Sequence, residues 1–186
     1  MTAKDGLEIE VKFRIGDTKP YEEKLEKLGA KFIESGLERN IKYKGNGLEK
    51  TKDLLRLRTY GGKIVLTHKR KPKNHNPDFK VQEETDVIVD ISENAKKILE
   101  RLGYEKSWIY EKRRQIWILD GVEVLIDELP LIGNFIEIEG SEEEIKSTAK
   151  KLGFYMKDAS TKNYGEEYKI WRKSMGLPKE DLIFRE

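Results

Sequence analysis

The chain has 186 residues, of which 37% are hydrophobic and 39% are charged, so one domain with its own core is expected, with at most a helical appendage. The absence of cysteine excludes a disulfide scaffold, a thiolate zinc site and a cysteine nucleophile. Because 37 Lys and Arg residues nearly cancel 35 Asp and Glu residues, the net charge of +2 indicates no particular class of partner. No apolar run approaches the roughly 18 residues that span a bilayer, and the N-terminus lacks the apolar stretch of a secretory signal, so we expect a cytoplasmic protein with no membrane partner.

Alternation of apolar and polar residues predicts strands that have one apolar and one polar face. In the first of them, at residues 7–15, five apolar residues share one face. The further predicted strands are residues 54–58, 64–69, 81–89, 108–119, 122–127 and 134–139. Glycine-containing turns at 60–63 and 120–121 predict hairpins. Seven or eight strands joined mostly by hairpins indicate an antiparallel sheet large enough to curl or close.

Helices are predicted between several of these strands. They are residues 19–28, 92–102 and 142–152, with a fourth from about 163 to 175. The first three end in Leu-Gly, and glycine just past the last turn is the usual left-handed cap. Ser141 and Glu144 predict a capping box for the third helix, and Asp90 and Glu93 predict one for the second.

The fourth helix carries an apolar stripe and is stopped by Gly176-Leu-Pro178. The stripe consists of Tyr164, Tyr168, Trp171 and Met175. We expect this helix to pack on the sheet or on a second subunit. The whole chain, residues 1–186, is therefore predicted to be a single domain, with a barrel at about 7–165 and a C-terminal helical appendage at about 163–186.

The polar strand faces consist almost entirely of charged residues, with the two signs largely on separate strands. For any single strand the simplest interpretation is a face exposed to water. Like charges at neighbouring inward positions of one strand repel each other, however, so each pair of like charges needs a partner of opposite charge. A divalent cation serves the acids and a polyanion serves the bases. If an eight-stranded sheet closes with the charged face inside, it makes a cavity for one small ligand, which these charges predict to be a phosphate chain with a metal ion.

The segment Glu8-Ile-Glu10-Val-Lys12 resembles the opening Glu-x-Glu-x-Lys strand of the CYTH superfamily, the triphosphate tunnel metalloenzymes. The further matching elements are Leu55-Arg56-Leu57-Arg58, Leu66-Thr67-His68-Lys69, Glu83-Glu84, Glu111-Lys112-Arg113-Arg114, Asp127 and Gly133-Asn-Phe-Ile-Glu137-Ile-Glu139. The resemblance covers about residues 7–165. It implies an α+β fold: a closed eight-stranded antiparallel β-barrel, or tunnel, with helices packed on the outside.

The resemblance also implies roles for individual residues, with Mg²⁺ or Mn²⁺ as the cofactor. The metal ligands would come from Glu8, Glu10, Asp127, Glu137 and Glu139. The triphosphate would bind to Lys12, Arg56, Arg58, Lys69, Lys112 and Arg114. The catalytic residues would be Glu10, Lys12 and Glu84. Glu84 and Asp127 would also line the tunnel as supporting acids.

Two segments depart from the family pattern. Asn40-Ile-Lys42-Tyr43 stands where an acidic-x-Tyr-Phe element is common, and Ser160 and Tyr164 are separated where a Ser-Tyr pair is common. Both lie near the expected tunnel ends, where substrate choice would be set.

The leading functional hypothesis is metal-dependent hydrolysis of a small-molecule triphosphate such as ATP, tripolyphosphate or thiamine triphosphate. A class IV adenylate cyclase, which makes cyclic AMP and pyrophosphate from ATP, is the alternative. A non-catalytic polyphosphate-binding or nucleic-acid-binding module is a further alternative. The basic run Lys69-Arg-Lys-Pro-Lys73 favours nucleic acid only weakly, because such runs are usually solvated loops. A monomer and a homodimer are both compatible with the sequence.

Overall fold

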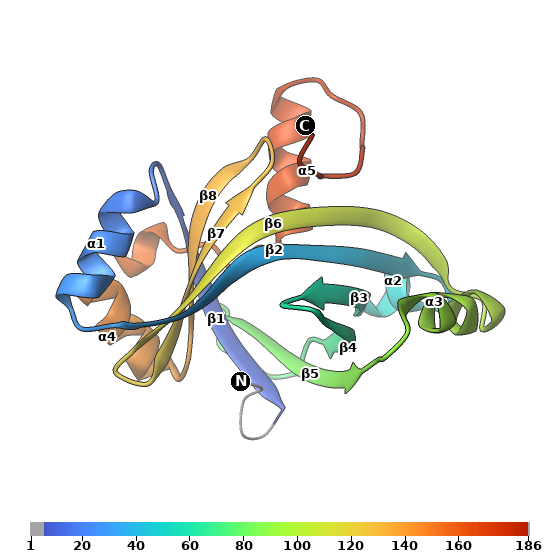
Figure 1. The fold of residues 1–186 in the computed structure, drawn as a ribbon, viewed down its shortest axis with the longest axis horizontal. Helices are drawn as coiled ribbons and strands as arrows, with labels where there is room; N and C mark the ends of the chain where they lie inside the picture. The colour runs from blue at the N-terminus through green and yellow to red at the C-terminus, as the bar shows by residue number, and fades with distance from the viewer. Residues whose placement is uncertain (1–5, 186) are drawn as a thin grey trace.

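The computed structural model describes residues 6–185, and in it eight antiparallel strands close into a barrel (Figure 1). The strands are β1 (Leu7–Ile15), β2 (Lys31–Lys44), β3 (Leu54–Tyr60), β4 (Lys63–Arg70), β5 (Lys80–Ile88), β6 (Glu105–Leu119), β7 (Val122–Leu129) and β8 (Gly133–Glu139). Around the barrel their order is β1-β5-β4-β3-β2-β6-β7-β8. The predicted α+β fold with a closed antiparallel barrel is confirmed.

The helices pack around the outside of this barrel. They are α1 (Lys19–Lys27), α2 (Leu48–Thr51), α3 (Ser92–Arg101), α4 (Glu142–Leu152) and α5 (Tyr164–Ser174), with a 3₁₀ turn at Met156–Asp158. In Figure 1, α1 and α4 lie at one end of the molecule, whereas α2 and α3 lie at the opposite end. Within residues 6–185, no helix combines the length and the apolar composition needed to cross a membrane.

The hydrophobic core lies between the outer face of the barrel and the helices. Val11 and Ile138 of the barrel are fully buried and belong to one apolar cluster with Ile145 and Ala149 of α4. Burying each of the larger aliphatic side chains, Val11, Ile138 and Ile145, stabilises the fold by about 1.5–3 kcal/mol. The opposite side chains of the same strands point into the barrel, and Lys12 there is as buried as Val11. The charged face is therefore inside.

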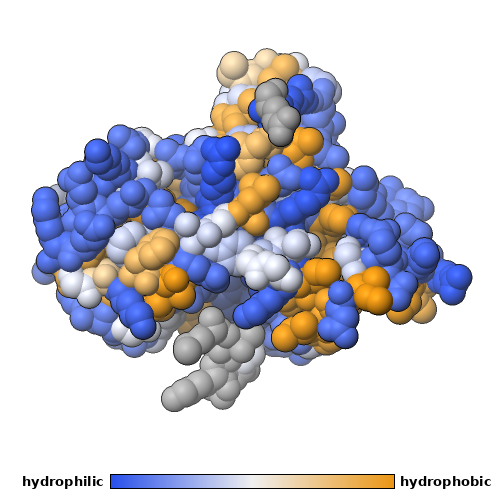
Figure 2. Space-filling view, in the orientation of Figure 1, coloured by the Kyte–Doolittle hydropathy of each residue, from blue (hydrophilic) through white to orange (hydrophobic). Residues whose placement is uncertain are grey.

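Several apolar side chains remain exposed. Figure 2 shows a mostly hydrophilic face interrupted by apolar patches. Val87, Ile88 and Ile91, at and just after the end of β5, are each more than half exposed.

The helix ends follow the predicted glycine caps. Gly29, Gly103 and Gly153 have φ angles of +78°, +84° and +88°, which a side chain would strain. The capping box of α4, made by Ser141 and Glu144, is also confirmed.

The capping box predicted for α3 is wrong. Helix α3 begins at Ser92, so its N-cap is Ile91, which makes no side-chain capping bond. Asp90 lies one residue too early to cap, and Glu93 instead pairs with Lys96 on the helix surface.

The largest difference from the prediction is strand β2, for which no residue range was predicted. Its first half exposes Phe32, Ile33 and Leu37. A register shift against β6 between Phe32 and Glu34 interrupts the period of two. The short helix α2 also went unpredicted, and β7 continues to Leu129, so Asp127 lies inside the strand and not at its end.

Helix α5 packs its aromatic stripe on the barrel. Tyr164 and Tyr168 are buried in one cluster with Trp108, Tyr110 and Phe135, and Trp171 packs against that cluster. The predicted stripe is confirmed for its first three members, whereas Met175, the fourth, is exposed.

Candidate active site

The barrel encloses a cavity of about 210 Å³ whose walls are mostly polar or charged. Eleven of the twelve residues that the sequence predicted for the site line it: Glu8, Glu10, Lys12, Arg56, Arg58, Lys69, Glu84, Lys112, Arg114, Glu137 and Glu139. The first turn of α5 adds Tyr164 and Gly165 to the wall. Asp127, the twelfth, lies behind the cavity surface.

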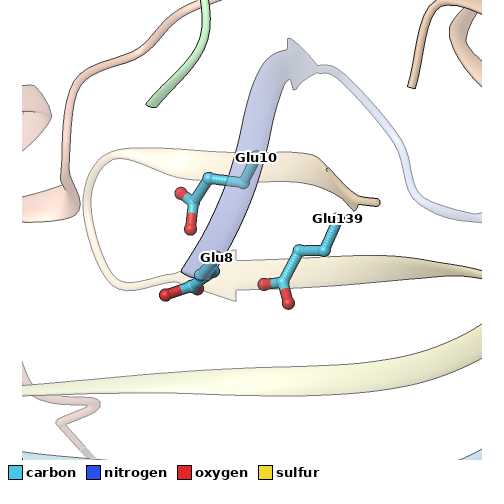
Figure 3. Close-up of side chains that lie close together, drawn as sticks. All are labelled: Glu8, Glu10 and Glu139. Carbon is cyan, nitrogen blue, oxygen red and sulfur yellow. The ribbon is translucent and has the colours of Figure 1, made fainter. Parts of the chain in front are cut away.

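Three carboxylates converge at one place in the cavity (Figure 3). Glu8 and Glu10 come from β1 and Glu139 from β8, and one oxygen of each lies within 4.8 Å of the others. The pairing of Glu10 opposite Glu139 in the sheet register brings them together. Burial raises the pKa of Glu139 well above its usual range, and the carboxylates of Glu8 and Glu10 raise it further.

This group of three acids, the carboxylate trio, fits a divalent cation. Its members repel one another when ionised, and a bound cation would remove that repulsion. Carboxylate oxygens are the donors that Mg²⁺ and Mn²⁺ prefer. Glu137 and Asp127, the other two acids expected as ligands, are outside the trio.

Lys12 lies next to the trio and is fully buried. Its Nζ atom is 3.1 Å from Glu10 Oε1 and 3.0 Å from Glu137 Oε1, the latter from its cross-strand partner on β8. Burial by itself would lower the pKa of Lys12, but Glu137 and Glu10 outweigh it and raise the pKa above its usual value. Lys12 therefore keeps its charge at any physiological pH.

Asp127 does not line the cavity but contacts the two β6 cations that do, Lys112 and Arg114. It accepts hydrogen bonds from Lys112 Nζ (2.9 Å), Arg114 Nε (2.7 Å), Arg114 Nη2 (2.5 Å) and the Tyr164 hydroxyl (2.8 Å). Arg114 also reaches Glu137 at 2.5 Å. Both oxygens of Asp127 accept hydrogen bonds and its side chain has no exposed surface, so it lies apart from the three converging acids; the metal-binding role expected of it stays a prediction.

A second group of ion pairs lines the opposite wall. Lys69 contacts both Glu8 and Glu84, the latter at 2.8 Å. Arg56 lies 3.9 Å from Glu84 and donates a hydrogen bond to the Tyr110 hydroxyl at 3.2 Å. Burial would raise the pKa of Glu84, but Lys69 lowers it. Every cation that the sequence predicted for this wall is thus held in place by an acid or a hydroxyl.

Ser160 and Tyr164, although separated in sequence, meet at the same lysine. Ser160 exchanges two backbone hydrogen bonds with Lys12, of 3.0 and 2.8 Å, and the Tyr164 ring lies 5.0 Å from the Lys12 ammonium.

Several charged residues of the site were not predicted. Lys42 lines the cavity, Lys80 lines it and lies 2.9 Å from Glu10, and buried Glu38 lies 3.6 Å from Lys112. Glu38 and Lys42 belong to β2, where the inward alternation Glu38-x-Asn40-x-Lys42 is present in the sequence but was not recognised as a strand. Lys80 precedes the predicted start of β5 by one residue.

Comparison with known proteins gives a family. The model of the CYTH domain matches residues 6–170. A Methanocaldococcus jannaschii protein that bears the name of an adenylate cyclase is 31% identical over 170 residues, covering 90% of this chain and 95% of that protein.

Solved structures agree with this match. One from Pyrococcus horikoshii has a TM-score of 0.73 at 30% identity and covers 86% of this chain and 98% of its own. A Hippeastrum protein named as an adenylyl cyclase, for which a dominant triphosphatase activity is described, shares the fold, with a TM-score of 0.59 at 18% identity over 92% of this chain and 97% of its own. Together with the charged barrel interior, the match over residues 6–170 shows that this chain belongs to the CYTH domain family.

Proposed function

We propose that this protein is a divalent-metal-dependent enzyme that hydrolyses the triphosphate group of a small molecule inside its barrel. The observation that carries the proposal is the convergence of the carboxylate trio and the six predicted cations in one cavity of about 210 Å³. A dry interior of this kind would be costly, because desolvation of buried ions often exceeds their attraction. Binding of a polyanion together with a metal ion would account for such a charged interior.

The cations would bind and orient the phosphate chain. Arginine suits bidentate contacts with phosphate oxygens, whereas lysine acts as a compact charge. Because Asp127 and Glu137 hold Arg114 in place, little reorganisation is needed when substrate arrives. Catalysis of phosphoryl transfer rests mainly on such positioning and electrostatic stabilisation.

Glu8, Glu10 and Glu139 would hold the metal ion. When bound there, Mg²⁺ or Mn²⁺ would supply positive charge to the phosphate oxygens as charge develops on them. We assign Glu84 the role of positioning Lys69 and not that of a base, since the lowered pKa of Glu84 makes it a weak proton acceptor. Lys12, permanently charged, would bind substrate oxygens beside the trio.

Cyclisation of ATP is the second candidate, and the name of the Methanocaldococcus jannaschii relative favours it. In that reaction the ribose 3′-hydroxyl attacks the α-phosphorus and pyrophosphate leaves. Both reactions would use the same cations, and they differ in how the organic end of the substrate lies in the cavity.

A product assay separates these functions. The purified protein is incubated with ATP and, separately, with tripolyphosphate, each with Mg²⁺ or Mn²⁺. Orthophosphate release supports hydrolysis, whereas cyclic AMP with pyrophosphate supports the cyclase. The Glu139→Gln variant should lose either activity, whereas Glu128→Gln, which changes an outward acid on β7, should keep it. Binding of tripolyphosphate without any product from the wild-type protein would leave only a binding module.

A further inference from the structure

Lys42 occupies a distinctive position on the cavity wall. It lies on β2 directly between Arg56 of β3 and Trp108 of β6 in the sheet register, and its Nζ atom is 5.9 Å from the centre of the Trp108 ring. Helix α5 packs closely here, because a Cβ at Gly165 would come within 3.4 Å of Trp108 and 3.9 Å of Lys42 Nζ. Lys42 also belongs to the segment that departs from the family pattern.

The surroundings of Lys42 differ from those of the other cations in the cavity. Apart from Lys52, those cations have a carboxylate within 4.0 Å, as the contacts of Lys12 and Arg58 illustrate. Among residues 6–185, Lys42 forms no ion pair although it is half-buried. Lys52, which also lines the cavity without one, is exposed at the rim and solvated.

The charges that face Lys42 are mostly positive. Burial lowers its pKa to about 8, with Arg56, Lys179 of the C-terminal tail and Lys80 of β5 adding to the effect and Glu166 of α5 opposing it. The neighbouring Arg56 has a buried Nε atom that makes no hydrogen bond. Lys42 thus has no carboxylate partner, and Arg56 beside it keeps one donor without an acceptor, so both can bind an added anion.

We propose that Lys42 is a further substrate-binding residue, which together with Arg56 forms a subsite for one anionic phosphate group of the substrate. The inference rests on the proposed function and adds to it a residue that the sequence did not predict. An anion next to Lys42 stabilises its protonated form, so binding takes up a proton. Affinity is therefore full below pH 8 and declines as the pH rises through the pKa of Lys42.

The test is calorimetric binding of tripolyphosphate, in EDTA so that turnover is suppressed, at pH 7 and pH 9.5. We expect Lys42→Met to weaken binding roughly tenfold at pH 7, the effect of one charged hydrogen bond, and less than about twofold at pH 9.5, where Lys42 has lost its proton. The matched control is Lys44→Met on the same strand, where the lysine pairs with Glu105 at 3.0 Å and does not line the cavity. It should bind like the wild-type protein at both pH values.

The outcomes separate this inference from the function on which it rests. Absence of tripolyphosphate binding by the wild-type protein would remove both. Wild-type binding that Lys42→Met leaves unchanged, or weakens equally at both pH values, would overturn the subsite alone.

A measurement on the wild-type protein covers the case in which Lys42→Met does not fold. In protein with ¹³Cε-labelled lysine, one resonance should titrate near pH 8, and saturation with tripolyphosphate should move that titration up by about one pH unit. A titration near pH 8 that tripolyphosphate does not move would also overturn the proposal.

Discussion

Replacing Asp127 by Asn tests whether the cations of β6 depend on the carboxylate behind them. The substitution keeps the shape of the side chain but removes the charge that accepts four hydrogen bonds from Lys112, Arg114 and Tyr164. Breaking a buried ion pair by removing one partner typically costs about 3–5 kcal/mol. Arg114 keeps Glu137 at 2.5 Å, and Lys112 keeps Glu38 at 3.6 Å. We therefore expect a loss of about 2–4 kcal/mol, somewhat below the full cost.

Urea unfolding at pH 7 measures this loss, with Glu128→Gln as the control. Glu128 is the next residue on β7 but points outward, and its pair with Arg113 at 3.0 Å is exposed, so its loss should cost less than about 1 kcal/mol. Tripolyphosphate should also stabilise Asp127→Asn more than the wild-type protein, because two cations have lost their carboxylate. Equal unfolding free energies for the two variants would refute the role given to Asp127.

Three further predictions concern the buried acids and the helix ends. Burial would raise the pKa of Glu38, but Lys112 and the cavity arginines lower it, so its contribution to stability is present above about pH 4.5 and lost as the pH falls. Glu38→Gln should thus destabilise the protein most at pH 7 and less at pH 3, and a constant difference in unfolding free energy would contradict this. Mn²⁺ should raise the melting temperature of the wild-type protein but not of Glu139→Gln; a shift retained in the variant would exclude Glu139 as a ligand. Ser141→Ala should cost about 1 kcal/mol by loss of the cap on α4, whereas Asp90→Ala should cost almost nothing, and equal costs by urea unfolding would refute the assignment of the two helix ends.

Strands with clean alternation indicated an antiparallel sheet with a charged face, and the family resemblance then implied the closed barrel and the site residues. In β1, the parity that buries Val11 outside also turns Glu10 and Lys12 inward, and each of these side chains has the predicted surroundings. The antiparallel pairing of β1 with β8 then brings Glu139 to Glu10. The inward direction of these side chains follows from local periodicity, which one sequence displays directly, whereas closure of the barrel was implied by the family resemblance.

The remaining features depend on tertiary contacts or on interrupted periodicity. The bulge near Phe32 and the exposed Leu37 interrupt the alternation, so β2 was not recognised as a strand. Lys42 was therefore not predicted as a site residue. The partners of Asp127 come from β6 and α5, and no spacing along the chain reports that Tyr164 donates to this carboxylate. The sequence thus predicted Asp127 as an acid of the site, but only the three-dimensional packing shows which groups it contacts.

The most direct test of the charged barrel as a triphosphate site is a crystal structure with tripolyphosphate and Mn²⁺. We predict an anomalous Mn²⁺ peak within bonding distance of Glu8, Glu10 and Glu139, with the phosphate chain contacting Lys12 and Arg114 inside the barrel. A peak or a phosphate chain found only on the outer surface, with the cavity filled by water, would contradict the account.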